Sequence, residues 1–95
     1  MKNGSKKFIR WLKELGVWSY WLHCYQNDEE NKQLTVKNFL TKTTPSRYMA
    51  CAFKWVGSNA TMWCDLHWVW LDYHYQIIDF DESLKRASTY IENEI

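Results

Sequence analysis

The chain has 95 residues, a formal net charge of +1 and three cysteines, and it contains seven Trp, six Tyr and four Phe. This length predicts one domain with one hydrophobic core, and the balanced charge excludes a strongly acidic or strongly basic binding protein. The cysteines are odd in number and irregularly spaced, which excludes a disulfide framework. The sequence has neither a signal peptide nor an uncharged apolar run of about 18 residues, so it predicts a cytoplasmic protein without a membrane span.

The first predicted helix covers residues 6–26 and follows Ser5, whose hydroxyl group is a predicted N-cap. Its large apolar residues recur three or four positions apart, which is typical of one face of a helix. Gly16 interrupts this stripe, and Gly inside a helix costs about 1 kcal/mol relative to Ala. A break at Gly16 would leave two shorter helices, 6–15 and 17–25.

Two helices are predicted in the middle of the chain. Thr35 is a predicted N-cap for a short helix through residues 36–40, and Pro45 ends that segment because the residue before a proline is driven out of the helical region. Ser46 is predicted to cap the next helix, whose apolar residues lie between positions 48 and 56.

The segment 52–80 holds four of the seven tryptophans and is predicted to contain the central helix. Its N-cap is predicted at Ser58 or Asn59. The helix is expected to end near residues 78–81, because Asp79 and Asp81 would be unfavourable at the negative end of the helix dipole. The large apolar residues recur in steps of three and four, and they are Trp63, Leu66, Trp70, Tyr73, Ile77 and Phe80.

Asp81 or Ser83 is predicted to open a last helix over residues 84–91. The sequence therefore predicts an all-α fold, in which residues 1–95 form a single domain built as a bundle of four to five helices with an aromatic-rich core.

One pattern of aromatic and apolar residues runs through most of the chain. It consists of Trp11-Leu12, Trp18, Trp21, Phe39-Leu40, Ala52-Phe53, Trp55, Ser58, Met62-Trp63, Leu66-His67 and Trp70. The order of these residues resembles that of small uncharacterised phage and prophage proteins. The resemblance covers about residues 8–71 and departs from the family in lacking its Glu-Gly link and in having Met62 where Phe is usual. It implies a helical fold and an accessory role, such as interference with a host defence system or a host enzyme.

Aromatic residues outnumber what a small core can enclose, since each ring can bury about 150–250 Å². Those off the main apolar stripes are expected at the surface, where aromatic clusters tend to be interfaces. The predicted partner-binding residues are Trp18, Tyr20, Trp21, Trp68 and Tyr75. The alternative, in which large residues fill the core, has about equal weight.

A basic cluster at Lys6, Arg10 and Lys13 gives a second hypothesis, a nucleic-acid-binding module. Aromatic side chains beside such a cluster can stack on unpaired bases. The balanced net charge argues against this hypothesis, and a solvated helix face explains the same residues.

A third hypothesis is a Cys/His site for metal binding or catalysis, centred on Cys64, His67 and His74. Tetrahedral zinc requires four ligands, usually in closely spaced pairs, and only one pair here has a usable spacing, so a structural role is favoured. A thiol nucleophile at Cys64 or Cys24 with His67 and an acid, Asp65 or Asp72, is disfavoured because one helix cannot supply a whole catalytic site.

The function predicted from these patterns is a small phage-type accessory protein that binds and occludes a protein partner. The partner would be host-encoded, with a defence system such as CRISPR-Cas as one target, and the protein would act in the cytoplasm of the bacterial host. We predict no enzymatic activity and no cofactor or metal. Self-association as a homodimer through the same aromatic residues is compatible with this function.

Overall fold

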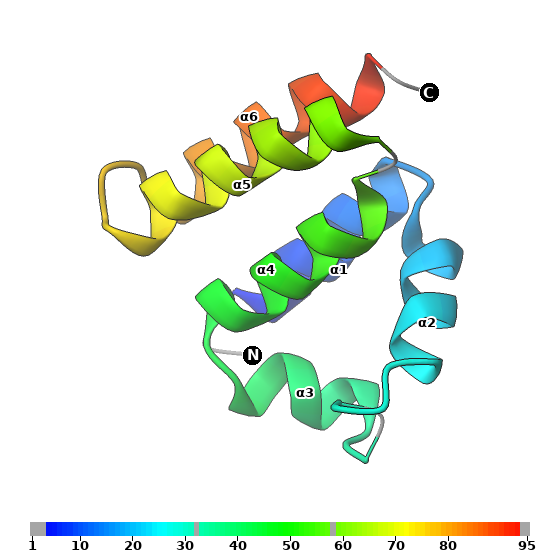
Figure 1. Ribbon diagram of the computed structural model, residues 1–95. Coiled ribbons are helices and arrows are strands. Elements are labelled where there is room, and N and C mark those ends of the chain that lie inside the picture. The colour runs from blue at the N-terminus through cyan, green and yellow to red at the C-terminus, as the bar shows by residue number, and fades with distance from the viewer. Residues whose placement is uncertain (1–3, 32, 58, 94–95) are drawn as a thin grey trace. The chain divides into compact units, whose positions relative to one another are not determined.

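A computed structural model describes residues 4–31, 33–57 and 59–93, and the described residues form helices without strands (Figure 1). The all-α prediction is confirmed. Six helices are seen in the described part of the chain, against the four to five predicted. They are α1 (Ser5–Glu14), α2 (Trp18–Gln26), α3 (Val36–Lys42), α4 (Pro45–Val56), α5 (Ala60–His74) and α6 (Phe80–Glu92).

The chain divides into two compact units, one up to Tyr48 and the other from Met49 onward. The first unit contains α1, α2, α3 and the first turn of α4. The second contains the remainder of α4 together with α5 and α6. The assignment of the whole chain to one domain remains a prediction.

A break at Gly16 separates α1 from α2, as the sequence suggested. The N–H of Gly16 donates to the Lys13 carbonyl at 3.0 Å, and the N–H of Val17 donates to the Leu12 carbonyl, also at 3.0 Å. This pair of bonds is the Schellman motif, which requires a left-handed residue after the helix. Gly16 supplies it with a φ of 75°. The predicted cap at Ser5 is wrong, because Ser5 is the first residue of α1 and Gly4 is its N-cap.

The first unit buries mostly aromatic side chains. Trp21 stacks on Trp18 at 5.4 Å and on Tyr25 at 5.5 Å between ring centroids, because positions three and four apart share one face of α2. Phe8 lies 4.7 Å from Tyr48 between ring centroids. The buried apolar residues of this unit are Phe8, Trp11, Leu12, Trp21, Tyr25, Phe39, Leu40 and Tyr48.

The link between α2 and α3 is held by polar contacts. The Tyr25 hydroxyl group lies 2.8 Å from the Asn31 carbonyl oxygen and 2.6 Å from that of Leu34. The buried Asn31 side chain donates to an Asp28 carboxylate oxygen at 3.0 Å and accepts a hydrogen bond of 2.8 Å from the Arg47 guanidinium group. These bonds satisfy polar groups that would otherwise be costly to bury.

The starts of α3 and α4 are capped differently. The predicted Thr35 cap is confirmed, since its Oγ1 accepts from the Asn38 N–H at 3.1 Å. The predicted Ser46 cap is wrong, because α4 begins at Pro45 and the Oγ1 of Thr44 accepts from the Arg47 N–H at 3.3 Å. Proline suits a first helical position, where its missing N–H costs nothing.

In the second unit, α5 begins at a cap predicted from the sequence and ends earlier than predicted. The Asn59 side chain accepts from the Met62 N–H at 2.9 Å, and the alternative cap, Ser58, lies outside the described residues. The helix ends at His74 rather than near residues 78–81, because Gln76 adopts a left-handed φ of 63°.

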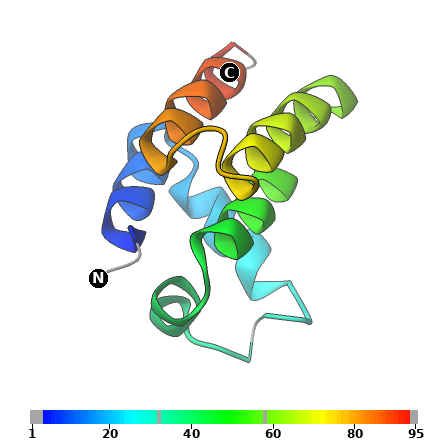
Figure 2. The same ribbon diagram turned by 90° about the vertical axis from the view of Figure 1, so that its left-hand side faces the viewer.

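The chain then turns back, and α6 runs antiparallel beside α5 (Figures 1 and 2). Asp79 is the N-cap of α6, and its Oδ1 accepts from the Glu82 N–H at 2.8 Å. Asp81 and Ser83 therefore lie inside this helix and do not open it. The acidic residues meet the positive end of the α6 dipole, where they are favourable.

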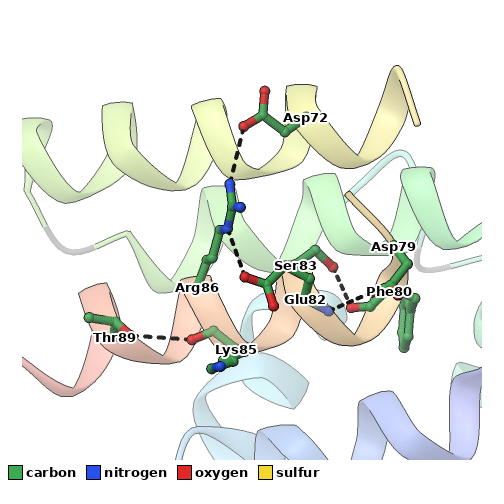
Figure 3. Close-up of polar contacts among 8 residues, drawn as sticks. All are labelled: Asp72, Asp79, Phe80, Glu82, Ser83, Lys85, Arg86 and Thr89. Atoms are coloured by element: carbon green, nitrogen blue, oxygen red, sulfur yellow. Dashed lines mark hydrogen bonds and ion pairs between the residues drawn. The ribbon is translucent and has the colours of Figure 1, made fainter. Parts of the chain in front are cut away.

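An arginine joins the two helices of this hairpin (Figure 3). The Arg86 guanidinium group lies 3.1 Å from a Glu82 carboxylate oxygen and 3.6 Å from one of Asp72 on α5. All three side chains are partly exposed, so solvent screening keeps the contribution of these ion pairs small. The buried apolar residues of the second unit are Met49, Ala52, Phe53, Val56, Met62, Leu66, Val69, Leu84, Ala87 and Ile91.

Candidate protein-binding surface

Helix α5 presents three faces, and only one of them is fully buried. The buried face carries Met62, Leu66 and Val69, which are spaced by four and three residues. These side chains account for the inward packing of the helix. The two other faces carry most of its aromatic side chains and are the candidate functional surfaces.

The second face is a continuous stack of rings, which we name the α5 ring stack. Trp63 and His67 lie 5.3 Å apart between ring centroids, with planes inclined by 4°. His67 and Trp70 follow at 5.7 Å, and Trp70 and His74 at 4.8 Å. Such parallel stacks restrict each ring to one orientation, because a rotation of one ring would collide with the next.

The ring stack borders a pocket in the second unit, which we name the α4–α5 pocket. It has a volume of about 220 Å³ and is lined by Ala50, Phe53 and Lys54 of α4 together with Trp63, His67 and Trp70. Ligand pockets for drug-sized molecules span roughly 300–1,000 Å³. The α4–α5 pocket is therefore suited to a group about the size of one large side chain.

The third face projects away from the core, and we name it the α5 outer face. Its members are Trp68 within the helix and Tyr75 at the C-cap, which are 67% and 69% exposed, and Ile77 in the turn that follows is 70% exposed. Trp68 and Tyr75 are seven positions apart, close to two helical turns, so they lie on one side of the helix and its cap. Exposed large apolar residues in this density are typical of a binding surface.

The structure confirms exposure for only part of the set predicted to bind a partner. Tyr20, Trp68 and Tyr75 are exposed, and Trp18 is half-buried against Trp21. The expected exposure of Trp21 is wrong, since its side chain is 0% exposed. Trp21 is enclosed because it stacks between Trp18 and Tyr25 and also lies 6.3 Å from the Phe39 ring.

Sequence reasoning assigned two surface residues to the buried stripe of the central helix. Trp63 is 44% exposed and lines the α4–α5 pocket, and Ile77 is 70% exposed in the turn after α5. The repeating steps of three and four fitted either of two adjacent faces. Met62 and Val69, which widen the predicted stripe on one side, are buried together with Leu66, and they mark the face that packs inward.

Within the first unit, Tyr20 and Cys24 lie one helical turn apart on α2. The proximity of Cys24 raises the pKa of Tyr20, chiefly through side-chain hydrogen bonding and to a smaller extent through the negative charge of the Cys24 thiolate and through burial. Tyr20 therefore remains a neutral phenol over the physiological pH range, when it offers both an apolar ring and a polar tip.

The basic residues of α1 share one exposed face. Lys6, Arg10 and Lys13 are spaced by four and three residues and are all exposed. The Lys13 ammonium group lies 5.4 Å from the centroid of the Trp18 ring, within the range of a cation–π contact. The structure thus brings the predicted nucleic-acid-binding residues together with one aromatic side chain.

His67 and His74 lie in the α5 ring stack, on either side of Trp70, and Cys64 is not part of that stack. Asp72 is next to Arg86 of α6. Cys64 is exposed, and Cys24 and Cys51 are half-buried. Across the described residues, no three His, Cys, Asp or Glu side chains are grouped so as to hold a metal ion.

Comparisons with family models, curated proteins and solved structures find no match to this chain. None of the helices in the described ranges combines the length and the apolar character that crossing a bilayer demands.

Proposed function

We propose that this chain is a small accessory protein that binds a protein partner through the α5 outer face and occludes a functional surface of that partner. The observation that carries this proposal is the exposure of Trp68 within α5, of Tyr75 at its C-cap and of Ile77 in the turn that follows. Trp and Tyr are the residues most enriched among those that dominate binding energy at protein interfaces. Burial of such rings against a partner would remove a large apolar area from water.

The resemblance to small phage and prophage proteins favours a host-encoded partner in a bacterial cytoplasm. A protein of this size can inhibit a larger assembly by covering a surface, without chemistry of its own. A host defence complex such as CRISPR-Cas is one partner of this kind. The proposal requires a stable scaffold with a few exposed aromatic residues, and Trp68 lies within α5 while Tyr75 is its C-cap.

The test is affinity capture from bacterial lysate with the tagged chain, with and without nuclease, followed by mass spectrometry. A Trp68→Ser/Tyr75→Ser double variant should lose the captured protein in both conditions. A Tyr90→Ser variant is the matched control, because Tyr90 is an exposed aromatic residue on α6. Undiminished capture by the double variant, with the fold intact by circular dichroism, would contradict the proposed surface.

A second candidate function is binding to single-stranded nucleic acid through the exposed face of α1. It is favoured by the placement of Lys6, Arg10 and Lys13 on one side of the helix, with Lys13 over the Trp18 ring. Affinity for an oligonucleotide should then fall steeply with salt, because phosphate contacts release counterions. A triple change of these residues to Gln should abolish binding, and salt-independent binding would exclude this function.

A further inference from the structure

The α4–α5 pocket has a chemistry distinct from that of the α5 outer face. Three of its six lining residues are aromatic hydrocarbon or indole side chains, namely Phe53, Trp63 and Trp70. Lys54 is the one lysine or arginine among these lining residues, and its side chain is exposed. The pocket therefore offers apolar ring surfaces together with one cation.

Gly57 follows α4 and lies close to two residues that line this pocket, Phe53 and Trp63. A Cβ atom at Gly57 would lie 3.0 Å from the Phe53 carbonyl oxygen and 3.3 Å from the Cα of Trp63. The backbones of the two helices therefore approach closely at this point. Because His67 is stacked between Trp63 and Trp70, the aromatic wall is also ordered before any ligand arrives. Such preorganisation lowers the entropic cost of binding.

We propose that the α4–α5 pocket receives an aromatic side chain of the protein partner, with a carboxylate of the partner placed beside it against Lys54. This inference rests on the proposed function and specifies the partner's chemistry. The volume of about 220 Å³ matches one aromatic side chain, aromatic rings pair favourably in stacked or edge-on geometry, and the Lys54 ammonium group complements a carboxylate.

A nucleotide would also combine a ring with an anion, but the pocket favours the protein partner. Nucleic-acid affinity comes largely from several phosphate contacts with lysine and arginine side chains. The pocket lining supplies one such side chain, and residues 55–95 hold only two lysines and arginines against seven acidic residues. The single cation fits one carboxylate better than a chain of phosphates.

The test uses small probes and observes the tryptophan indole N–H signals of the 95-residue chain by NMR. N-acetyltryptophan carries a ring and a carboxylate, and N-acetyltryptophanamide carries the same ring without the charge. We expect both probes to shift the Trp63 and Trp70 signals, with N-acetyltryptophan binding about two- to fivefold more tightly at low salt. N-acetylaspartate, which lacks the ring, should leave these signals unchanged.

A Lys54→Gln variant should bind the two ring-containing probes equally, whereas the matched Lys85→Gln variant on α6 should retain the difference. Both lysines are exposed, so neither change removes core packing.

The inference is overturned if the ring-containing probes do not shift the Trp63 and Trp70 signals, or if adenosine monophosphate binds more tightly than N-acetyltryptophan. Partner capture that still depends on Trp68 and Tyr75 would leave the proposed function intact in that case. Probe binding by a chain that captures no protein would support the pocket chemistry and contradict the proposed function.

Discussion

Tyr25 joins the core of the first unit to the link that follows α2. Its ring is buried between Trp21 and Phe39, and its hydroxyl group lies within hydrogen-bond distance of the Asn31 and Leu34 carbonyl oxygens. Burial, and to a smaller extent the Asp28 carboxylate, raises the pKa of Tyr25 above its usual value. The folded state therefore favours the neutral phenol.

A Tyr25→Phe variant should lose about 1–3 kcal/mol of unfolding free energy at neutral pH, because the carbonyl groups would lose a buried donor. Since the pKa of Tyr25 is raised on folding, its contribution is fully present below about pH 10 and is lost as pH rises through the folded-state pKa. Urea unfolding at several pH values measures both effects. The fall above pH 10 should be smaller in the variant.

The exposed Tyr75 provides a matched control for this measurement. A Tyr75→Phe change should alter the unfolding free energy by less than about 0.5 kcal/mol, as is usual for surface positions. Equal stabilities of the wild type and the Tyr25→Phe variant would show that the hydroxyl group does not hold the link.

Individual aromatic residues were harder to place from the sequence than the helices that carry them. Trp21 was expected at the surface and is buried, whereas Trp63 was expected in the buried stripe and lines a pocket. Tryptophan is large and apolar on either face of a helix, so its identity does not determine its burial. The burial of a tryptophan is decided by tertiary contacts, such as that between Trp21 and Phe39 on α3.

Among the helices, the boundary between α5 and α6 shows why periodicity alone misplaced an end. The steps from Tyr73 to Ile77 and Phe80 fit a continuous helix, yet the N–H of Gln76 donates to the Tyr73 carbonyl at 3.0 Å and that of Ile77 to the Asp72 carbonyl at 2.8 Å. These bonds form a Schellman motif. Glutamine gives no sequence signal for it, whereas Gly16 marked the corresponding end of α1.

A Gln76→Gly variant should be stabilised by about 0.5–1 kcal/mol. Gln76 has a left-handed φ of 63°, which costs a residue with a side chain about 1–2 kcal/mol. Glycine avoids this cost, but its greater conformational freedom in the unfolded chain offsets part of the stabilisation. Thermal unfolding measures the change. A Gly16→Ala variant should be destabilised, because alanine would have to adopt the left-handed φ of 75° that Gly16 has. Destabilisation by Gln76→Gly would contradict this account of the turn.

The cap of α6 gives a separate prediction for the same hairpin. An Asp79→Ala variant should lose about 1 kcal/mol of unfolding free energy, because the Glu82 N–H would lose its acceptor. An Asp79→Asn variant retains an acceptor oxygen and should lose only the charge–dipole part, about 0.3–1 kcal/mol. Chemical denaturation measures the unfolding free energy of each variant. Equal losses in the two variants would show that Asp79 stabilises the helix through its charge alone, and not through its hydrogen bond.

Sequence reasoning succeeded for elements whose ends carry side-chain signals. Thr35 and Asn59 were identified as caps because their side chains can accept from the first-turn amides, and both do so. Sequence reasoning failed where one residue type fits two positions, since Asp79 is equally compatible with the end of one helix and the start of the next. The pocket also could not be predicted, because it depends on how α4 packs against α5.

For the whole molecule, charge is divided along the chain. Residues 1–54 hold ten lysines and arginines and four acidic residues, and residues 55–95 hold two and seven, which gives 10 − 4 = +6 and 2 − 7 = −5. The α5 outer face lies in the acidic part but is itself apolar. Binding through it should therefore depend on ring burial and only weakly on salt, whereas binding through α1 should depend strongly on salt.

The most direct measurement is the dissociation constant for the purified captured partner, at about 50 mM and about 200 mM salt. Loss of two interface aromatic residues typically costs about 2 kcal/mol or more, so the Trp68→Ser/Tyr75→Ser variant should bind at least about thirtyfold more weakly at both salt concentrations. The Tyr90→Ser control should bind like the wild type. Equal affinities of the double variant and the wild type, or wild-type affinity that collapses with salt, would contradict binding through the α5 outer face.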